Sequence, residues 1–154
     1  MRTILQRVKW ARVSTGGAVV GEIGPGLLVL AGLGAEDSEE DLDLMAEKIV
    51  NLRIHEDDGG KMNLSLLETG GALLVISQFT LYADCRKGRR PSFVKAAAPE
   101  RARVLFAQFV ERLRALGVCV QTGRFGAMMD VELCNAGPVT VILDTADLRA
   151  PRRA

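Results

Sequence analysis

Three polar side chains interrupt an otherwise apolar segment at Ser77-Gln78-Phe79-Thr80. A hydroxyl or an amide that is buried without a hydrogen-bond partner costs about 1–3 kcal/mol. The cluster therefore either satisfies itself inside the core or faces a ligand. The residues of this segment alone do not decide between these two interpretations.

The segment that follows is basic, because residues 86–90 hold four bases in five positions, including Arg89 and Arg90, before Pro91-Ser92-Phe93. A basic loop is usually only solvated. Next to polar residues and an aromatic side chain, a basic loop is also typical of a site that binds the phosphates of an RNA end.

A second unusual segment is Asn135-Ala136-Gly137-Pro138-Val139-Thr140. Gly-Pro between two strands is ordinarily a turn, and only about 5–6% of X–Pro bonds in folded proteins are cis. Nothing in the residues themselves distinguishes the two isomers of the Gly137–Pro138 bond.

Several catalytic signatures are missing. The chain has no phosphate-binding P-loop, and Gly24-Pro25-Gly26 and Gly32-Leu33-Gly34 lack the third glycine of a dinucleotide fingerprint. There is no G-x-S-x-G pattern either. The one histidine, His55, lies in a polar stretch, where we expect a surface residue rather than a member of a catalytic triad.

The cysteines, at positions 85, 119 and 134, form no C-x-x-C pair, which argues against a disulfide framework and a thiolate zinc site. They lie in or beside apolar stretches, so we expect Cys85, Cys119 and Cys134 to be packing residues. The sequence predicts neither a metal nor a cofactor.

The composition is that of one soluble globular domain, with 154 residues, 48% of them apolar and 25% charged. The net charge is +1, but residues 36–43 hold six acids and no base, so the rest of the chain carries +7 and can present a basic face. No signal peptide and no apolar run long enough for a membrane span is present. We expect a cytoplasmic protein without membrane contact.

The elements that must position these residues are mostly strands. Apolar and β-branched runs bounded by glycine turns predict strands over residues 2–9, 18–23, 27–31, 72–82, 118–122, 128–134 and 139–144. Two helices are expected. The first covers 39–52, with Ser38 and Asp41 in a capping-box pattern, and the second runs from Pro99 to Leu116, with Gly117 as its C-terminal cap. Strands that do not alternate with helices predict an α+β fold.

These segments together resemble the D-aminoacyl-tRNA deacylase family, also called D-tyrosyl-tRNA deacylases. The resemblance covers residues 1–145. Ala136 departs from the aspartate expected in many members. The motifs that carry the resemblance are Met1-Arg2 through Gln6-Arg7-Val8, Gly21 to Leu30, Ser77 to Leu81, Arg86 to Phe93, Phe125-Gly126-Ala127 with Met129, and Asn135 with Gly137 to Thr140.

The resemblance implies a single domain over residues 1–145, a compact β-barrel-like body of mostly antiparallel strands with two helices. It implies a homodimer that hydrolyses the ester between a D-amino acid and the 3′ end of tRNA, and that also clears glycine from alanine tRNA. Residues 146–154 match nothing in the family, and we expect a basic, disordered tail there.

The resemblance also implies roles for individual residues. Ser77, Gln78, Phe79 and Thr80 of one subunit form the catalytic pocket. Gly137 and Pro138 of the other subunit, joined by a cis bond, reach into it and exclude L-amino acids. The remaining substrate-binding residues implied are Arg7, Met129, Arg89 and Arg90.

Two mechanisms fit this pocket. An aminoacyl ester is already activated, so its hydrolysis needs positioning and oxyanion stabilisation more than a strong base. The preferred mechanism uses the 2′-hydroxyl of the tRNA to activate water, with backbone amides near Phe79 and Thr80 holding the oxyanion. In the alternative, Thr80 is the nucleophile, although its sequence surroundings offer no base. A non-catalytic RNA-binding module is the alternative from a different class.

Overall fold

The computed structural model describes residues 1–151, and residues 152–154 lie outside the described part of the chain. Its central strand, β1 (Arg2–Thr15), pairs antiparallel with β2 (Ala18–Ile23), β3 (Gly26–Gly32) and β8 (Asp130–Asp144). The sheet continues from β3 through β6 (Ala72–Ser77) to β7 (Val120–Thr122), and these two pairings are parallel. Most strand pairs are therefore antiparallel, as predicted.

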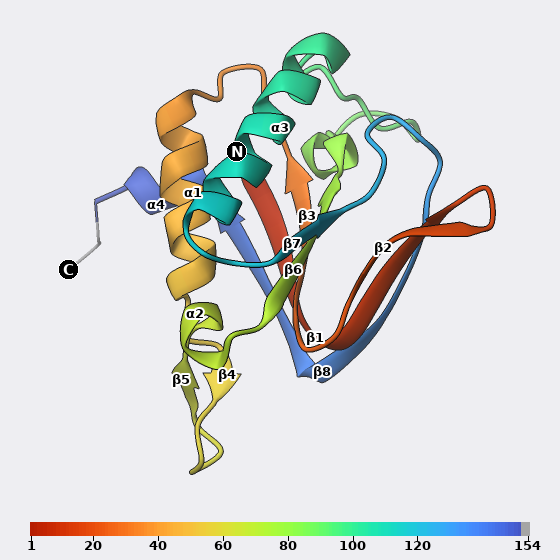
Figure 1. Cartoon of the computed structure of the whole chain (residues 1–154). Coiled ribbons are helices and arrows are strands. Elements are labelled where there is room, and N and C mark those ends of the chain that lie inside the picture. Colours follow the sequence, from red (N-terminus) through yellow and green to blue (C-terminus); the bar gives the residue numbers. More distant parts are fainter. Residues whose placement is uncertain (152–154) are drawn as a thin grey trace.

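Two long helices, α1 (Glu39–Asn51) and α3 (Pro99–Ala115), cover one face of the sheet (Figure 1). The prediction of only two helices is wrong, because the described residues also form α2 (Leu66–Thr69) and α4 (Thr145–Arg149). A small separate hairpin, β4 (His55–Glu56) and β5 (Met62–Leu64), extends from the lower end of the molecule. The α+β class is confirmed.

The ends of the long helices follow the signals in the sequence. The Asp41 carboxylate accepts a hydrogen bond from the backbone N–H of Ser38 at 2.9 Å, which closes the predicted capping box of α1. Pro99 is the first residue of α3, and Gly117 follows the helix with a φ of 88°, a conformation that favours glycine.

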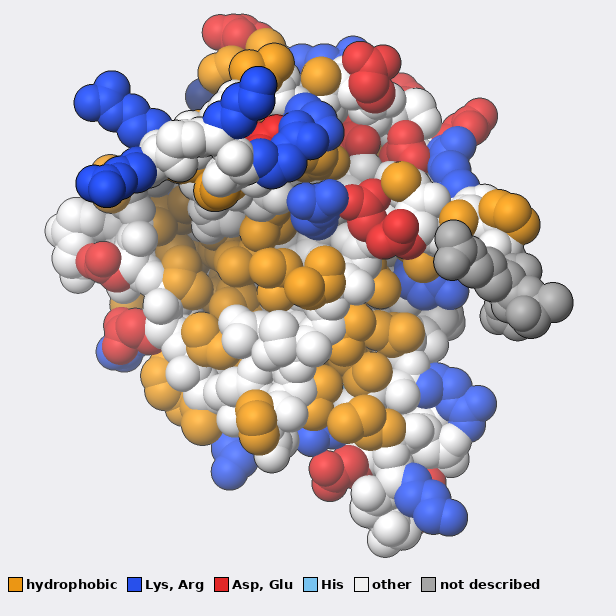
Figure 2. Space-filling model, turned by 180° about the vertical axis from the view of Figure 1, so that it is seen from behind, with side chains coloured by type: hydrophobic (Ala, Val, Ile, Leu, Met, Phe, Trp, Pro, Cys, Tyr) orange, Lys and Arg blue, Asp and Glu red, His pale blue; other side chains and the backbone are white. Residues whose placement is uncertain are grey.

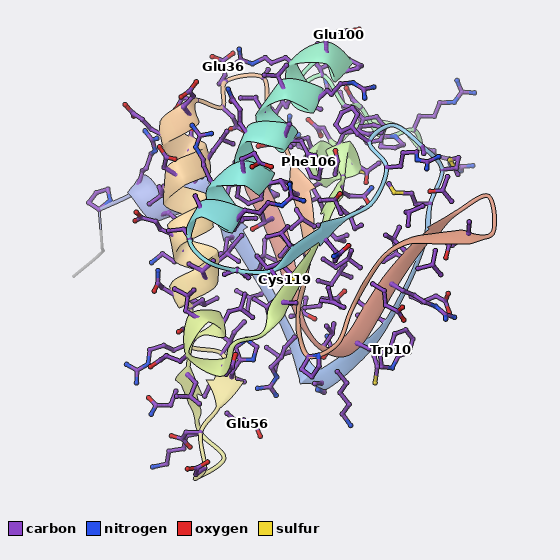
Figure 3. All side chains as sticks on the ribbon, viewed as in Figure 1. Trp10, Glu36, Glu56, Glu100, Phe106 and Cys119 are labelled. Atoms are coloured by element: carbon purple, nitrogen blue, oxygen red, sulfur yellow. The ribbon has the colours of Figure 1, made fainter. Side chains whose placement is uncertain are left out.

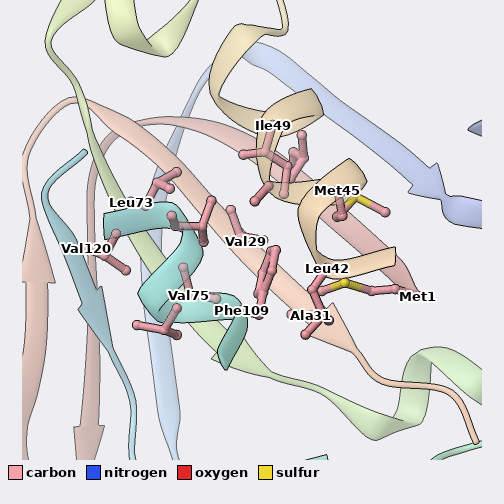
Figure 4. Close-up of a cluster of buried hydrophobic side chains, with 14 of the residues drawn as sticks. Met1, Val29, Ala31, Leu42, Met45, Ile49, Leu73, Val75, Phe109 and Val120 are labelled. Atoms are coloured by element: carbon pink, nitrogen blue, oxygen red, sulfur yellow. The ribbon is translucent and has the colours of Figure 1, made fainter. Parts of the chain in front are cut away.

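The sheet buries apolar side chains on both of its faces. The larger cluster lies between the sheet and α1 and α3, with Phe109 and Leu42 fully buried (Figure 4). The second cluster includes Val13, Leu28 and Ile76 and lies where the sheet curls onto itself. The sheet is thus nearly closed into a barrel, as predicted.

Close backbone contact allows this curl. A Cβ atom on Gly21 of β2 would lie 2.6 Å from the carbonyl oxygen of Thr122 of β7, so only glycine allows the two strands to approach this closely. None of the helices in residues 1–151 combines the length and apolarity that crossing a membrane requires.

The end of the chain differs from the prediction. Residues 145–149 form α4, and the Arg149 guanidinium lies 3.0 Å from the Asp41 carboxylate of α1. The prediction of a disordered tail from residue 146 is therefore wrong for residues 146–149. A long-range ion pair supports the helix that they form. Arg152 and Arg153 lie outside the described residues.

Candidate functional site

The polar segment lies at the end of β6. Ser77 pairs with Ala31 of β3, and the backbone N–H of Gln78 donates to the Ala31 carbonyl at 2.8 Å. The chain then leaves the sheet and forms a single 3-10 turn, η1 (Phe79–Tyr82). The prediction of one strand over 72–82 is therefore wrong after Ser77.

Glycines of β3 and the loop after it make room for this turn. A Cβ atom on Gly32 would lie 3.1 Å from both the Gln78 carbonyl oxygen and the Leu81 Cβ, and one on Gly34 would lie 2.7 Å from the Tyr82 hydroxyl. Arg2 holds the far end of the turn by donating to the Leu81 carbonyl at 3.0 Å. Burial first, and then Asp37 and Asp144, raise the pKa of the Tyr82 phenol, so it stays protonated at neutral pH.

The η1 turn leaves two kinds of group free. Phe79 is 54% exposed, and its ring packs edge-on against Phe93, with 5.0 Å between ring centroids. Within the described residues, neither the Phe79 nor the Thr80 backbone N–H has a hydrogen-bond acceptor, as is usual at the start of a helix. These two donors are available to an anionic group on a ligand.

Thr80 has a hydrogen-bond partner, but that partner is not a base. The Gln78 side-chain amide donates to the Thr80 hydroxyl oxygen at 2.5 Å. No carboxylate or imidazole of the described residues accepts a hydrogen bond from Thr80. The interaction orients both side chains and offers no route for removing the hydroxyl proton.

The basic loop (residues 86–90) lies beside the η1 turn. Two backbone hydrogen bonds between Asp84 and Ser92, of 2.8 and 2.9 Å, close its base. Arg86 folds back onto Asp84, and its hydrogen bonds lower the pKa of that carboxyl. The described residues offer no acidic partner to Arg89 or Arg90, which are exposed. Figure 2 shows basic side chains at the upper edge of this face, above a hydrophobic area.

Met129 lies on the inner side of the curled sheet, near the end of β6. A Cβ atom on Gly123 would lie 2.5 Å from the Met129 sulfur and 3.1 Å from the Ile76 Cδ1. Met129 is half-buried and packs against the second apolar cluster. It therefore lies near the strand that leads to Ser77.

The Gly-Pro segment (residues 136–139) interrupts the regular pairing of β8 with β1, and the two predicted strands on either side of it form one long strand. The Gly137–Pro138 peptide bond is cis. Asn135 spans the segment, because its side chain accepts from the Val139 N–H at 2.8 Å and donates to the Val139 carbonyl at 3.0 Å.

Arg7 supports the same segment from β1. Its guanidinium is almost fully buried and donates to the Ala136 carbonyl at 2.8 Å and to the Ile54 carbonyl at 2.9 Å. A third hydrogen bond, of 3.1 Å, goes to the Glu56 carboxylate. Sequence reasoning missed Glu56, and no local pattern marks it.

Within one chain, the η1 turn and the Gly-Pro segment do not meet. The Gly-Pro segment lies opposite Arg7, and the register across β3 places Arg7 level with Leu73 at the start of β6. Ser77 lies four residues further on, roughly 13 Å along the strand direction, on a strand three positions away in the sheet. In Figure 1, the bend of β8 is at the bottom of the molecule and the end of β6 is near the top.

Other sequence predictions are corrected. Cys85 and Cys119 are exposed rather than packed, and Cys134 is half-buried. His55 is not a plain surface residue, because its Nε2 atom is buried without a hydrogen-bond partner in the described structure. Burial, followed by the charge of Arg7, lowers the pKa of His55.

Comparisons with known proteins agree on one family. A family model described as D-Tyr-tRNA(Tyr) deacylase matches residues 4–144. A D-aminoacyl-tRNA deacylase of Bacillus licheniformis is 60% identical over 94% of this chain and 99% of its own length. A D-aminoacyl-tRNA deacylase of Chloroflexus aurantiacus is 59% identical over the whole chain and 96% of its own length.

Two solved structures have the same fold. One is described as a c-Myc DNA unwinding element binding protein, with a TM-score of 0.88 and 38% identity, and covers 94% of this chain and 98% of its own. The other, described as a probable eukaryotic D-amino acid tRNA deacylase, has a TM-score of 0.81 at 19% identity, with 92% and 97% coverage. The matched sequence and fold place the chain in the D-Tyr-tRNA(Tyr) deacylase family.

Proposed function

We propose that the protein is an editing hydrolase that cleaves the ester between a D-amino acid and the 3′-terminal ribose of tRNA. The observation that carries the proposal is the η1 turn, which presents two backbone N–H donors, an exposed aromatic ring and a basic loop together. The donors suit an oxyanion, the ring suits a base or side chain, and the loop suits phosphates. The family relationship supports the same activity.

The proposed mechanism is hydrolysis assisted by the substrate. The ribose 2′-hydroxyl activates the attacking water, and the Phe79 and Thr80 N–H groups stabilise the negative charge that develops on the carbonyl oxygen of the ester. Thr80 acts as a positioning residue, because its hydroxyl is bonded to the Gln78 amide and to no base among residues 1–151. The basic loop holds the tRNA backbone through Arg89 and Arg90.

The second element of the proposal is a homodimer in which the Gly-Pro segment of one subunit lies against the η1 turn of the other. The separation of these two regions within one chain supports it. So does the sheet face opposite the helices, where Leu30, Ile4 and Ile142 form a row across β3, β1 and β8. Ile142 is 67% exposed, and Figure 2 shows hydrophobic side chains gathered on this face.

The proposed role of the Gly-Pro segment is to reject L-amino acids. Enantiomers share every functional group, so an obstructing wall separates them better than attraction does. The backbone of residues 136–139, held by Arg7 and Asn135, is a wall that cannot rotate aside. Glycine has no side chain to obstruct, so the same wall admits glycine on alanine tRNA.

The test of this function is the release of labelled tyrosine from D-tyrosyl-tRNA and L-tyrosyl-tRNA by the purified protein. We expect release from the D-substrate only. Tight tRNA binding without release of either amino acid would contradict the proposal and favour a non-catalytic RNA-binding module.

The mechanism is tested separately with Thr80→Ala and with a tRNA that ends in 2′-deoxyadenosine. We expect Thr80→Ala to keep activity within about tenfold of the unsubstituted protein, while the deoxy substrate is nearly inert. If instead Thr80→Ala is inactive and the unsubstituted protein hydrolyses the deoxy substrate, Thr80 is the nucleophile.

A further inference from the structure

The orientation of the Arg7 guanidinium depends on three acceptors that lie in three directions. Two of them are backbone carbonyls, of Ala136 in β8 and of Ile54 just before β4. The third is the carboxylate of Glu56 on β4, and it is the one acceptor among the three that a side chain provides. Figure 3 shows Glu56 at the lower end of the molecule, where the β4–β5 hairpin and the bend of β8 lie.

The guanidinium nitrogen that Glu56 holds is also the one that lies against the Gly-Pro segment. The Arg7 Nη2 atom donates to the Glu56 Oε1 at 3.1 Å, and a Cβ atom on Gly137 would lie 3.1 Å from the same Nη2. A shift of Nη2 therefore changes the surface against which Gly137 rests.

Glu56 binds the buried Arg7 side chain but is itself largely exposed to solvent. The Arg7 side chain is 9% exposed, whereas the Glu56 side chain is 57% exposed. Removing the carboxylate leaves the Nη2 atom of the buried Arg7 guanidinium without its acceptor and leaves the apolar clusters intact. Glu56 is thus a position where the geometry of the clamp changes more than the stability of the fold.

We propose that Glu56 is a specificity-determining positioning residue, which fixes the Arg7 guanidinium and through it the Gly-Pro segment that rejects L-aminoacyl-tRNA. The inference rests on the proposed function of that segment. Glu56 touches no reacting atom. Its effect is expected in the ratio of D to L hydrolysis rather than in the rate on the D-substrate.

The experiment compares Glu56→Ala with Glu56→Gln, which keeps an oxygen acceptor at the same reach. Both are assayed on D-tyrosyl-tRNA and L-tyrosyl-tRNA beside the unsubstituted protein. Glu132→Ala is the matched control, because Glu132 also binds an arginine of β1, Arg12, through two hydrogen bonds of 2.8 Å, but at a regular part of β8.

We expect Glu56→Ala to lower the D-to-L ratio of kcat/KM about tenfold, mainly through faster L hydrolysis, because small displacements in a site have large kinetic effects. Glu56→Gln and Glu132→Ala keep the ratio of the unsubstituted protein. An unchanged ratio in Glu56→Ala, an equal loss of both activities, or a glutamine variant that behaves like the alanine variant would overturn the inference. Absence of D-selective hydrolysis in the unsubstituted protein would instead contradict the proposed function.

Discussion

The η1 turn is held in place mainly by main-chain contacts, whereas the Gly-Pro segment is held in place by side chains. At η1 the main chain supplies most of the positioning, through β6, the hydrogen bond between Gln78 and Ala31, and glycines that let the turn lie close to β3. The one long-range side-chain hydrogen bond to it in the described structure is from Arg2 to the Leu81 carbonyl. At residues 136–139, side chains hold the backbone: Arg7 from β1, and Asn135, which directly precedes the segment. Gly137 and Pro138 themselves are exposed. Each region therefore fails under a different kind of substitution.

Catalysis and selectivity depend on these two regions in different ways. The groups that η1 offers are N–H donors, which survive most changes of side chain at their own positions. The Gly-Pro segment presents backbone too, but its position depends on long-range side-chain contacts. We therefore expect catalytic rate to follow the backbone of η1 and chiral selectivity to follow Arg7.

The largest expected effect is on the catalytic rate. Phe79→Pro removes one of the two free N–H donors, at the first position of a helical turn, where proline is tolerated. Loss of one oxyanion donor lowers kcat by about 100-fold or more. Phe79→Ala keeps the donor and loses the ring, both its contact with Phe93 and the contact proposed with the substrate, so we expect activity within about tenfold. Equal activities of the two variants on D-tyrosyl-tRNA would refute the role of the donor.

The next effect is on selectivity. Arg7→Ala leaves the Ala136 and Ile54 carbonyls without their donor, and we expect the D-to-L ratio of kcat/KM to fall roughly 100-fold. Denaturant unfolding should show a loss of about 2 kcal/mol, since hydrogen bonds to a buried charge are removed.

Arg12→Ala is the control for Arg7, on the same strand and with the same change of charge, because Arg12 pairs with Glu132 at the surface. It should leave the ratio unchanged. Selectivity that persists in Arg7→Ala would mean that the Gly-Pro segment needs no side-chain support.

A smaller effect is expected at the basic loop. Replacing Arg89 and Arg90 by alanine should weaken tRNA binding and reduce the slope of log affinity against log salt by about 1–2, independent of the amino acid carried. The double variant Lys48→Ala, Lys61→Ala, with the same change of net charge on exposed positions, should bind like the unsubstituted protein. An unchanged salt slope in the arginine variant would show that the loop is only solvated.

The smallest effect concerns stability near the Arg7 clamp. The folded state lowers the pKa of His55 by burial and by the charge of Arg7, so it binds a proton less readily than the unfolded chain. Stability of the unsubstituted protein therefore falls as pH drops through about 6.5, the ordinary histidine range. His55→Phe also removes a buried nitrogen without a partner.

We therefore expect His55→Phe to raise the melting temperature, and to raise it more at pH 5.5 than at pH 7.5. A gain that is equal at both pH values would show that the proton plays no part. A lower melting temperature would show that the ring nitrogen contributes to packing.

Much of the fold could be predicted from local patterns. Most strand positions, both long helices, the capping box at Ser38 and the glycine after α3 follow from residue types at fixed spacing. The first strand was predicted too short, since β1 continues from residue 9 to Thr15, and the β4–β5 hairpin was not predicted. The short helices were missed, because four or five residues show no helical periodicity. For α2 a signal existed, since Ser65 and Glu68 form a second capping box.

The candidate site was harder to predict, for a physical reason. Leu81 and Tyr82 continue the apolar run of β6, and only the space beside Gly32 and Gly34 allows the chain to turn at Phe79. The exposed position of Cys85 follows from that turn. The contacts of Arg7 with Glu56 and Ala136 join positions 49 and 129 residues apart, and local patterns carry no trace of such pairs.

In the proposed dimer, the Gly-Pro segment of one subunit selects the substrate for the η1 turn of its partner. The most direct measurement uses a mixed dimer of one Phe79→Pro subunit and one Arg7→Ala subunit, isolated with two affinity tags and assayed on D- and L-tyrosyl-tRNA. If each active site is formed by both subunits, one site of this mixed dimer carries both substitutions. The other site combines the intact η1 turn of the Arg7→Ala subunit with the intact Gly-Pro segment of the Phe79→Pro subunit. We predict about half of the unsubstituted D activity, with full rejection of the L-substrate. Hydrolysis of both substrates, as in the Arg7→Ala homodimer, would place the two regions of each active site in one subunit and contradict the proposed dimer.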